Sequence, residues 1–239
     1  MADAQHIVKS YEAELTRLQQ LIVQMGGMVE NQVALACQAV VSGDSVAAVR
    51  AIESDPAVDA IEREVEQFVV QLLALRQPMA QDLRQIVSSL KITGDLERIG
   101  DYAANVAKRS MVLVQFSLPF SLAGLAHMVR LVQENLKSIL DAVENRDADR
   151  AIEVWRSDAG IDEIYTALFR ELMTYMMEDP RNITPCAHLL FIAKNLERIG
   201  DHATNVAETV YFAARGEPLV DNRPKDDRSV YAVVRPQRD

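Results

Sequence analysis

The sequence is poor in the residues that build disulfide scaffolds, sheets and turns. Its 239 residues include only two cysteines, nine glycines, eight prolines and 5% aromatic residues, whereas 49% are hydrophobic. Cys37 and Cys186 lie far apart, with no second thiol or histidine at a ligand spacing, so neither a disulfide framework nor a cysteine-based zinc site is predicted. The composition favours helices and excludes disordered and collagen-like chains.

Basic charge is scarce as well. Twenty-five Lys and Arg residues against 35 Asp and Glu give a formal net charge of -10, so we expect no nucleic-acid partner. The N-terminus has no apolar segment behind a basic start, which predicts a cytoplasmic protein. Ser110 to Val129 lacks charged residues, but polar side chains and Pro119 interrupt this stretch. We interpret it as a buried linker between two domains and expect no membrane span.

Apolar residues recur at spacings of three and four through nearly the whole chain, and no segment alternates as a strand would. Asp44, Asp147 and the pairs Asp55-Pro56 and Thr184-Pro185 have the pattern of helix N-termini. In the first half we expect helices over about 10–41, a short segment, 55–76 and 79–115. In the second half we expect helices over about 121–144, 147–156, 158–178 and 184–215.

The two halves are repeats of one another. Over residues 95–107 and 195–207, ten of thirteen positions are identical at an offset of 100, and both contain the sequence Leu-Glu-Arg-Ile-Gly-Asp. Upstream the offset is 103, which matches Asp44 with Asp147 and Asp55 with Asp158. The sequence therefore predicts an all-α protein of two homologous three-helix bundles with up-and-down, spectrin-like helices. The expected domains are 1–117 and 118–216, followed by a loosely ordered tail over 217–239.

Acidic residues at a spacing of four are the strongest candidates for a functional site. Thirty-five acids in 239 residues give several such pairs by chance, so the argument depends on register. If one hairpin turns at Pro78 and the other between Asp179 and Pro180, the acids of neighbouring antiparallel helices face each other in both halves. The predicted facing pairs are Asp59 with Glu97, Asp55 with Asp101, Asp162 with Glu197, and Asp158 with Asp201.

These carboxylates lie away from the apolar stripes of their helices, so we expect both clusters on the outside of the bundles. Like charges at this spacing repel, and two kinds of cation could offset them. Arg98 and Arg198 would give ion-paired grooves, whereas oxygen-ligated metal ions would give metal sites. Asn105 and Asn205 extend the rows as accessory ligands. We interpret Gly100 and Gly200 as sites of close helix packing, and His202 as a peripheral side chain.

Both Leu-Glu-Arg-Ile-Gly-Asp blocks, together with the connection from Arg76 to Arg84, resemble the PhoU family of bacterial phosphate-signalling proteins. This resemblance spans about residues 5 to 215 and implies two tandem three-helix bundles. It also implies surface clusters of iron or zinc, with manganese and magnesium as alternatives. The family's paired metal-binding motifs map onto the residues Asp55, Asp59, Glu97, Asp101, Asp158, Asp162, Glu197 and Asp201. Asn195 stands where the first half has Asp95, so the two sites need not bind the same metal.

The resemblance further implies a negative regulator of the phosphate-starvation response and of phosphate uptake. Such a protein would link the ATPase subunit of a Pst-type phosphate transporter to a PhoR-type histidine kinase, and we expect a homodimer. No catalytic residue is predicted, so we expect a protein that is not an enzyme. Two alternatives stay open, namely a metal-dependent phosphohydrolase and a helical adaptor without metal. A ferritin-like oxidase is disfavoured because no glutamate precedes a histidine by three residues.

Overall fold

The computed structural model of the chain describes residues 2–118 and 121–219, and within these ranges it contains helices and no strand. The N-terminal half consists of three long helices and the C-terminal half of three more, with one short 3-10 turn between the last two. Their bounds are α1 Ala2–Ser42, α2 Ser45–Arg76, α3 Ala80–Leu113, α4 Ala123–Asn145, α5 Ala148–Glu178, the 3-10 turn Pro180–Asn182, and α6 Ile183–Arg215.

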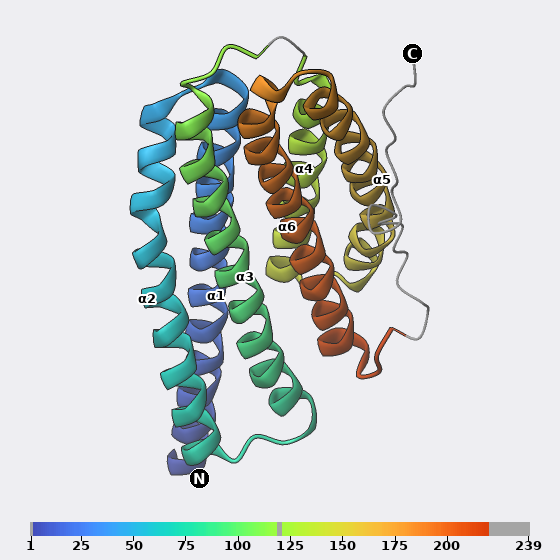
Figure 1. Cartoon of the computed structure of the whole chain (residues 1–239). Helices are drawn as coiled ribbons and strands as arrows, with labels where there is room; N and C mark the ends of the chain where they lie inside the picture. The colour runs from blue at the N-terminus through green and yellow to red at the C-terminus, as the bar shows by residue number, and fades with distance from the viewer. Residues whose placement is uncertain (1, 119–120, 220–239) are drawn as a thin grey trace.

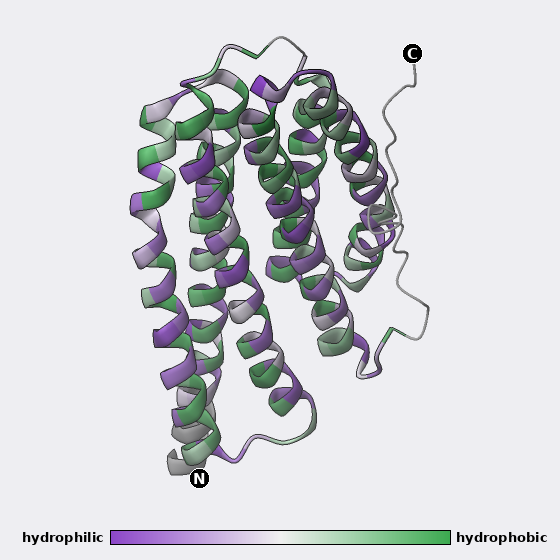
Figure 2. Cartoon of the chain, viewed as in Figure 1, coloured by the Kyte–Doolittle hydropathy of each residue, from purple (hydrophilic) through white to green (hydrophobic). Residues whose placement is uncertain are grey.

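Helices α1 to α3 form one bundle and α4 to α6 a second, with α3 and α6 side by side where the bundles meet (Figure 1). The contact between α3 and α6 is the most extensive of any helix pair, and α1 also contacts α4. Hydrophobic and hydrophilic residues alternate around each helix (Figure 2), as expected for amphipathic bundle helices. The predicted all-α fold of two three-helix bundles is confirmed.

The repeat is visible in the caps of the helices. Asp44 accepts hydrogen bonds from the backbone N–H groups of Val46 and Ala47 at the start of α2. Asp147 does the same at the start of α5, with the N–H groups of Asp149 and Arg150 as donors. Both caps satisfy donors that the first turn of a helix leaves unpaired.

The predicted break at Asp55-Pro56 was wrong, because α2 continues through Pro56 to Arg76. The proline removes one hydrogen bond from the helix. In the turn before the proline, Gln32 of α1 and Ser54 both donate to the carbonyl of Ala51. The corresponding break at Ser157 is also absent, and α5 runs on to Glu178. Each bundle therefore has three helices without an additional short one.

One contiguous apolar core extends through both bundles. Leu18, Met25 and Leu96 are fully buried in the first half, as are Met128 and Ile139 in the second. The helices are therefore held by packing of their apolar faces, and the connections between them are free to lie at the surface.

The connection between α3 and α4 includes the expected domain boundary at residue 117. It was predicted to be a buried linker, but Val114 and Phe116 are exposed, because the buried apolar residues belong to the flanking helices. No helix within the described ranges is long and apolar enough to cross a membrane. Helix α6 ends at Arg215 as predicted, with Gly216 as its C-cap, whereas the expected tail lies almost entirely outside the described residues.

Candidate functional site

The two halves bring their acidic residues together in the same way. A Cβ atom built on Gly100 would lie 3.8 Å from Asp55 Oδ1, and one built on Gly200 would lie 3.7 Å from Asp158 Oδ1. Each glycine precedes the aspartate, Asp101 or Asp201, that the predicted register places opposite. The two glycines allow α2 to approach α3, and α5 to approach α6, which confirms their interpretation as sites of close helix packing.

We call Asp55, Asp59, Glu62, Glu97 and Asp101 the first acidic cluster. Burial raises the pKa of the Glu97 carboxyl, and the nearby charges of Asp101, Glu62 and Asp59 raise it further, while Arg98 acts in the opposite direction. Burial also raises the pKa of Glu62, with repulsion from Glu66 and Asp59. Glu62 was not among the predicted residues, although it lies about one turn after Asp59 on the same helix. The carboxylates of this cluster therefore repel one another at neutral pH.

Arg98 provides part of the expected counter-charge. Its guanidinium lies 3.5 Å from Glu97 Oε2 and 3.8 Å from Asp101 Oδ2. Arg98 is largely exposed, and long exposed pairs of this kind contribute little to stability. Asp55 is held differently, because the amide of Gln32 in α1 donates to its Oδ1 atom over 2.9 Å. The first cluster is thus only partly neutralised by its own side chains.

The second acidic cluster comprises Asp158, Asp162, Glu197 and Asp201, and it differs in burial. Asp158, Asp162 and Glu197 are only 2%, 3% and 5% exposed. We expected both clusters on the outside, so this prediction was wrong for the second half. Helical periodicity places these acids away from the apolar stripe of their helix. It carries no information about which side chains of other segments cover them.

Lys194 is a second residue that the sequence analysis missed. Its ammonium donates to Glu197 Oε1 over 2.8 Å and lies 4.8 Å from the centre of the Tyr165 ring. At the repeat offsets, Lys194 corresponds to Gly94 and Tyr165 corresponds to Glu62. The second half therefore has a lysine and a tyrosine where the first half has a glycine and an acid. The spacing of three between Lys194 and Glu197 was the signal that could have revealed the pair.

Glu197 keeps one carboxylate oxygen without a partner. Its Oε2 atom is buried and accepts no hydrogen bond from the part of the chain that the structure describes. Burial raises the pKa of Glu197 to about 7, the hydrogen bond from Lys194 lowers it, and the charges of Asp201 and Asp162 raise it. A cation would fit the chemistry of this oxygen, yet an ammonium already neutralises the carboxylate.

A polar bridge between the bundles lies beside the first cluster. Asp95 Oδ1 of α3 is 2.7 Å from His202 Nδ1 and accepts a hydrogen bond from the amide of Asn205, both on α6. The rings of His202 and Tyr102 are 5.6 Å apart. Arg198 lies over the Tyr102 ring instead of pairing with the acids of its own bundle, so the expected role of Arg198 was wrong. Of the two proposed accessory ligands, Asn205 belongs to this bridge and Asn105 is exposed.

An open groove of about 540 Å³ joins these features, and its walls include Glu62, Glu97, Asp95 and His202. As they stand, no three His, Cys, Asp or Glu side chains within residues 2–118 and 121–219 converge into a metal-binding group. Side-chain rotation in the first cluster could bring its oxygens together, because these carboxylates are partly exposed. The oxygen-only donor set of the first cluster suits a hard or borderline cation. The second cluster fits a metal poorly while Lys194 is in place.

The comparison with known families identifies both halves of the chain. The sequence model of the PhoU domain matches it twice, over residues 22–110 and 125–210. A curated protein of Rhizobium meliloti, named "Phosphate-specific transport system accessory protein PhoU homolog", is 48% identical over 223 residues, covering 93% of this chain and 94% of that protein. A protein of the same name from Xylella fastidiosa is 50% identical over 224 residues, covering 94% of each chain.

Solved structures agree with the sequence comparison. The crystal structure of PhoU from Pseudomonas aeruginosa superposes with a TM-score of 0.84 at 41% identity, covering 87% of this chain and all of that one. The phosphate transport system regulatory protein PhoU from Streptococcus pneumoniae gives a TM-score of 0.80 at 30% identity, covering 87% and 99% of the two chains.

Proposed function

The chain belongs to the PhoU family, and we propose that it is a negative regulator of phosphate uptake and of the phosphate-starvation response. The observation that carries this proposal is the identity of 48% to 50%, over nearly the full chain, to proteins named accessory proteins of a phosphate-specific transport system. A role in the regulation of phosphate transport follows from these names. The finer proposal is that the protein links the ATPase subunit of a Pst-type transporter to a PhoR-type histidine kinase.

In this proposal the protein is a cytoplasmic homodimer that acts by binding its partners and not by catalysis. Long helices joined through one core give a stiff scaffold. The net charge of -10 gives it a surface that attracts basic patches on partner proteins. Such a scaffold can hold a transporter subunit and a kinase in a defined relation without chemistry of its own.

Deletion of the gene tests the regulatory proposal. In medium rich in phosphate, we expect the deletion strain to express phosphate-starvation reporters constitutively, because the link that signals sufficient phosphate is lost. Reporter activity in wild type, deletion and complemented strains measures the effect. An enzyme would instead produce a metabolic defect with normal control of the reporters. A deletion strain that still represses them, with no paralogue present, contradicts the proposal.

We further propose that the first acidic cluster binds a metal ion, with Asp55, Asp59, Glu97 and Asp101 as ligands. Iron and zinc are the first candidates, with manganese and magnesium as alternatives. The physical support is that burial, and then repulsion from the neighbouring acids, raises the pKa of Glu97, since a cation would relieve this repulsion. For Asp158, Asp162, Glu197 and Asp201 the same proposal requires the metal to displace the ammonium of Lys194, so we expect weaker binding there.

The double substitution Glu97→Gln with Asp101→Asn should lower the metal content while leaving helicity nearly unchanged, because both side chains are partly exposed. Metal analysis of protein purified without chelator, after supply of iron, zinc, manganese or magnesium, measures this effect, and circular dichroism monitors the helices. The control is Asp149→Asn with Glu153→Gln, which removes an exposed acid pair at the same spacing on α5. Wild-type protein that retains no stoichiometric metal would leave an ion-paired groove as the better interpretation.

A further inference from the structure

A second pocket, remote from both acidic clusters, lies at the junction of the two bundles. It has a volume of about 260 Å³ and is formed by α1 and α3 of the first bundle and by α6 and the end of α4 in the second. This is slightly below the roughly 300 to 1,000 Å³ of typical small-molecule sites. Its polar lining comes from Gln19, Gln81, Gln85, Ser88, Ser89 and Arg146. Apolar side chains, among them Ile22, Ile92 and Val210, form the remaining wall.

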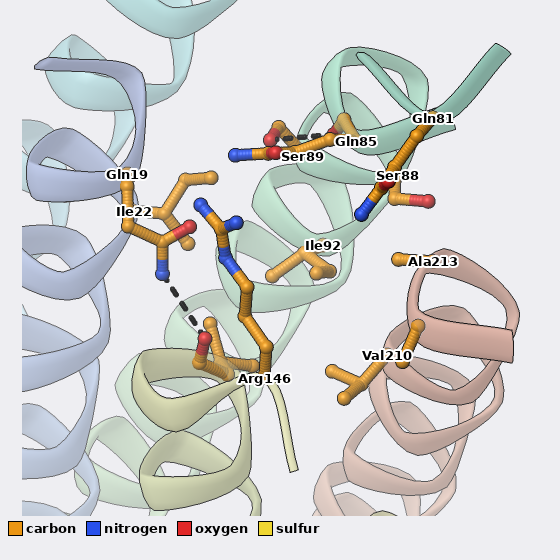
Figure 3. A pocket seen from close by; sticks show the side chains of 12 residues that line it. Gln19, Ile22, Gln81, Gln85, Ser88, Ser89, Ile92, Arg146, Val210 and Ala213 are labelled. Atoms are coloured by element: carbon orange, nitrogen blue, oxygen red, sulfur yellow. Dashed lines mark hydrogen bonds between the residues drawn. The ribbon is translucent and has the colours of Figure 1, made fainter. Parts of the chain in front are cut away.

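The charge of this pocket is opposite to that of the protein. No Asp or Glu lines it, although the chain has 35 acids, and Arg146 is its only charged residue. Figure 3 shows the guanidinium of Arg146 extending from the end of α4 into the space between α1 and α3. Some arginines of the protein are paired with acids, as Arg76 is with Glu14 and Arg150 is with Asp141. Within the described part of the chain, Arg146 forms neither an ion pair nor a side-chain hydrogen bond.

Ser88 is a second, independent indication of a ligand. It is 2% exposed and lines the pocket, and its hydroxyl has no hydrogen-bond partner among residues 2–118 and 121–219. Buried hydroxyls are nearly always paired, because an unpaired one costs about 1 to 3 kcal/mol. The neighbouring Ser89 is already satisfied, since it donates to the carbonyl of Gln85. Ser88 is therefore a donor for a group that enters the pocket.

The internal repeat shows that the arginine is not required by the turn in which it lies. Arg146 has a φ of 55° and immediately precedes the N-cap Asp147. The corresponding residue of the first half is Gly43, which has a φ of 68° and precedes the N-cap Asp44. Glycine or asparagine is usual at such a left-handed position. The arginine therefore adds to the second half a side chain for which the backbone has no need.

We propose that this pocket binds a small ligand through a phosphate group, either inorganic phosphate or a phosphate monoester with a compact apolar part. The guanidinium of Arg146 would donate two parallel hydrogen bonds to phosphate oxygens, a geometry that arginine favours. Ser88 would donate a third from the opposite bundle, and the apolar wall would contact the body of a monoester. The choice of phosphate over other oxyanions rests on the proposed function, whereas the anion site itself does not.

Because Arg146 belongs to the second bundle and Ser88 to the first, the bound phosphate group would connect them. A ligand that contacts both bundles stabilises one arrangement of the α3–α6 junction relative to others. The pocket is thus a place where the concentration of a phosphate compound can bias the relative position of the two halves. This gives the proposed regulator a sensor within its own fold.

Isothermal titration calorimetry of the full chain tests the proposal, with inorganic phosphate and phenyl phosphate as probes at millimolar concentrations. Phenyl phosphate distinguishes a monoester from the free ion, while sulfate and acetate test the preference for phosphate. We expect Arg146→Asn to weaken binding by roughly tenfold or more, since it removes charge-assisted hydrogen bonds, and Ser88→Ala to weaken it by about threefold. Arg146→Asn should fold normally, because asparagine tolerates a positive φ.

The matched control is Arg130→Gln, which removes an exposed arginine from the same helix outside the pocket and should bind as wild type does. Saturating probe should also raise the melting temperature of the wild type but not that of Arg146→Asn. Binding that survives Arg146→Asn, or no binding of either phosphate probe, overturns the proposed site. Sulfate or acetate binding as tightly as phosphate overturns the choice of phosphate. The deletion experiment is independent of all these outcomes, so a failure of the regulatory proposal is recognised separately.

Discussion

Replacement of Lys194 by Met should lower the free energy of unfolding by about 3 kcal/mol at about pH 8, because it leaves the buried Glu197 carboxylate without its cation. Glu197 is 5% exposed, and the ammonium of Lys194 donates a hydrogen bond to its carboxylate. Methionine keeps the length and the apolar contact of the lysine stem, so packing against Tyr165 is largely preserved. The lost stability should therefore come from the unpaired charge of Glu197 and not from a cavity. Urea unfolding followed by circular dichroism measures it.

The same substitution should cost much less at about pH 5, because Glu197 can then take up a proton and bury a neutral carboxyl. Adding Glu197→Gln to Lys194→Met should restore most of the stability at high pH for the same reason. Lys108→Met, on the exposed face of α3, is the matched control and should change stability by only a few tenths of a kcal/mol. Equal losses for Lys194→Met at both pH values would show that the ion pair is not what stabilises this region.

The second large effect is a decrease in the stability of the metal-free protein as pH rises from about 4.5 to about 7. The pKa of Glu197 is raised to about 7 in the folded state, mainly by burial. The folded protein therefore retains this proton at pH values where the unfolded chain has released it. The contribution of this bound proton to the free energy of unfolding is complete below the ordinary pKa of glutamate. It is lost as the pH rises through the pKa that Glu197 has in the folded protein. One pKa unit corresponds to 1.36 kcal/mol, so the maximum is about 3 kcal/mol.

Glu97 and Glu62 have raised pKa values as well, so they contribute in the same direction. Urea unfolding of chelator-treated protein across this pH range measures the slope. Glu197→Gln should remove most of it, whereas Glu153→Gln, at an exposed position on α5, should leave it unchanged. Stability that rises with pH over this range would contradict the assignment. If the dependence of stability on pH persists in Glu197→Gln, it arises from the titration of other groups.

The helices, and which acids share one face of a helix, could be predicted because both depend on local periodicity. Residues four apart lie on one face of a helix wherever that helix packs, and a repeated motif imposes the same face twice. The failure at Pro56 has an equally local cause. A proline preceded by an aspartate resembles a helix start, but α2 continues through Pro56, and Asp55 accepts a hydrogen bond from Gln32 of α1 instead of capping a new helix. Gln32 lies in another helix, so its contribution was not visible in the segment itself.

The sequence by itself determined the fold class, the repeat and which acids share a helix face, since these follow from spacing along one helix or between two copies. Only the tertiary structure decided that Asp158, Asp162 and Glu197 are buried, because burial depends on what neighbouring segments cover. It also decided the pocket at the junction of the two bundles, whose walls come from four helices. Arg146 and Ser88 are far apart in the chain and share no periodicity. Their proximity arises from the packing of α3 against α6 and of α1 against α4, which no local pattern specifies.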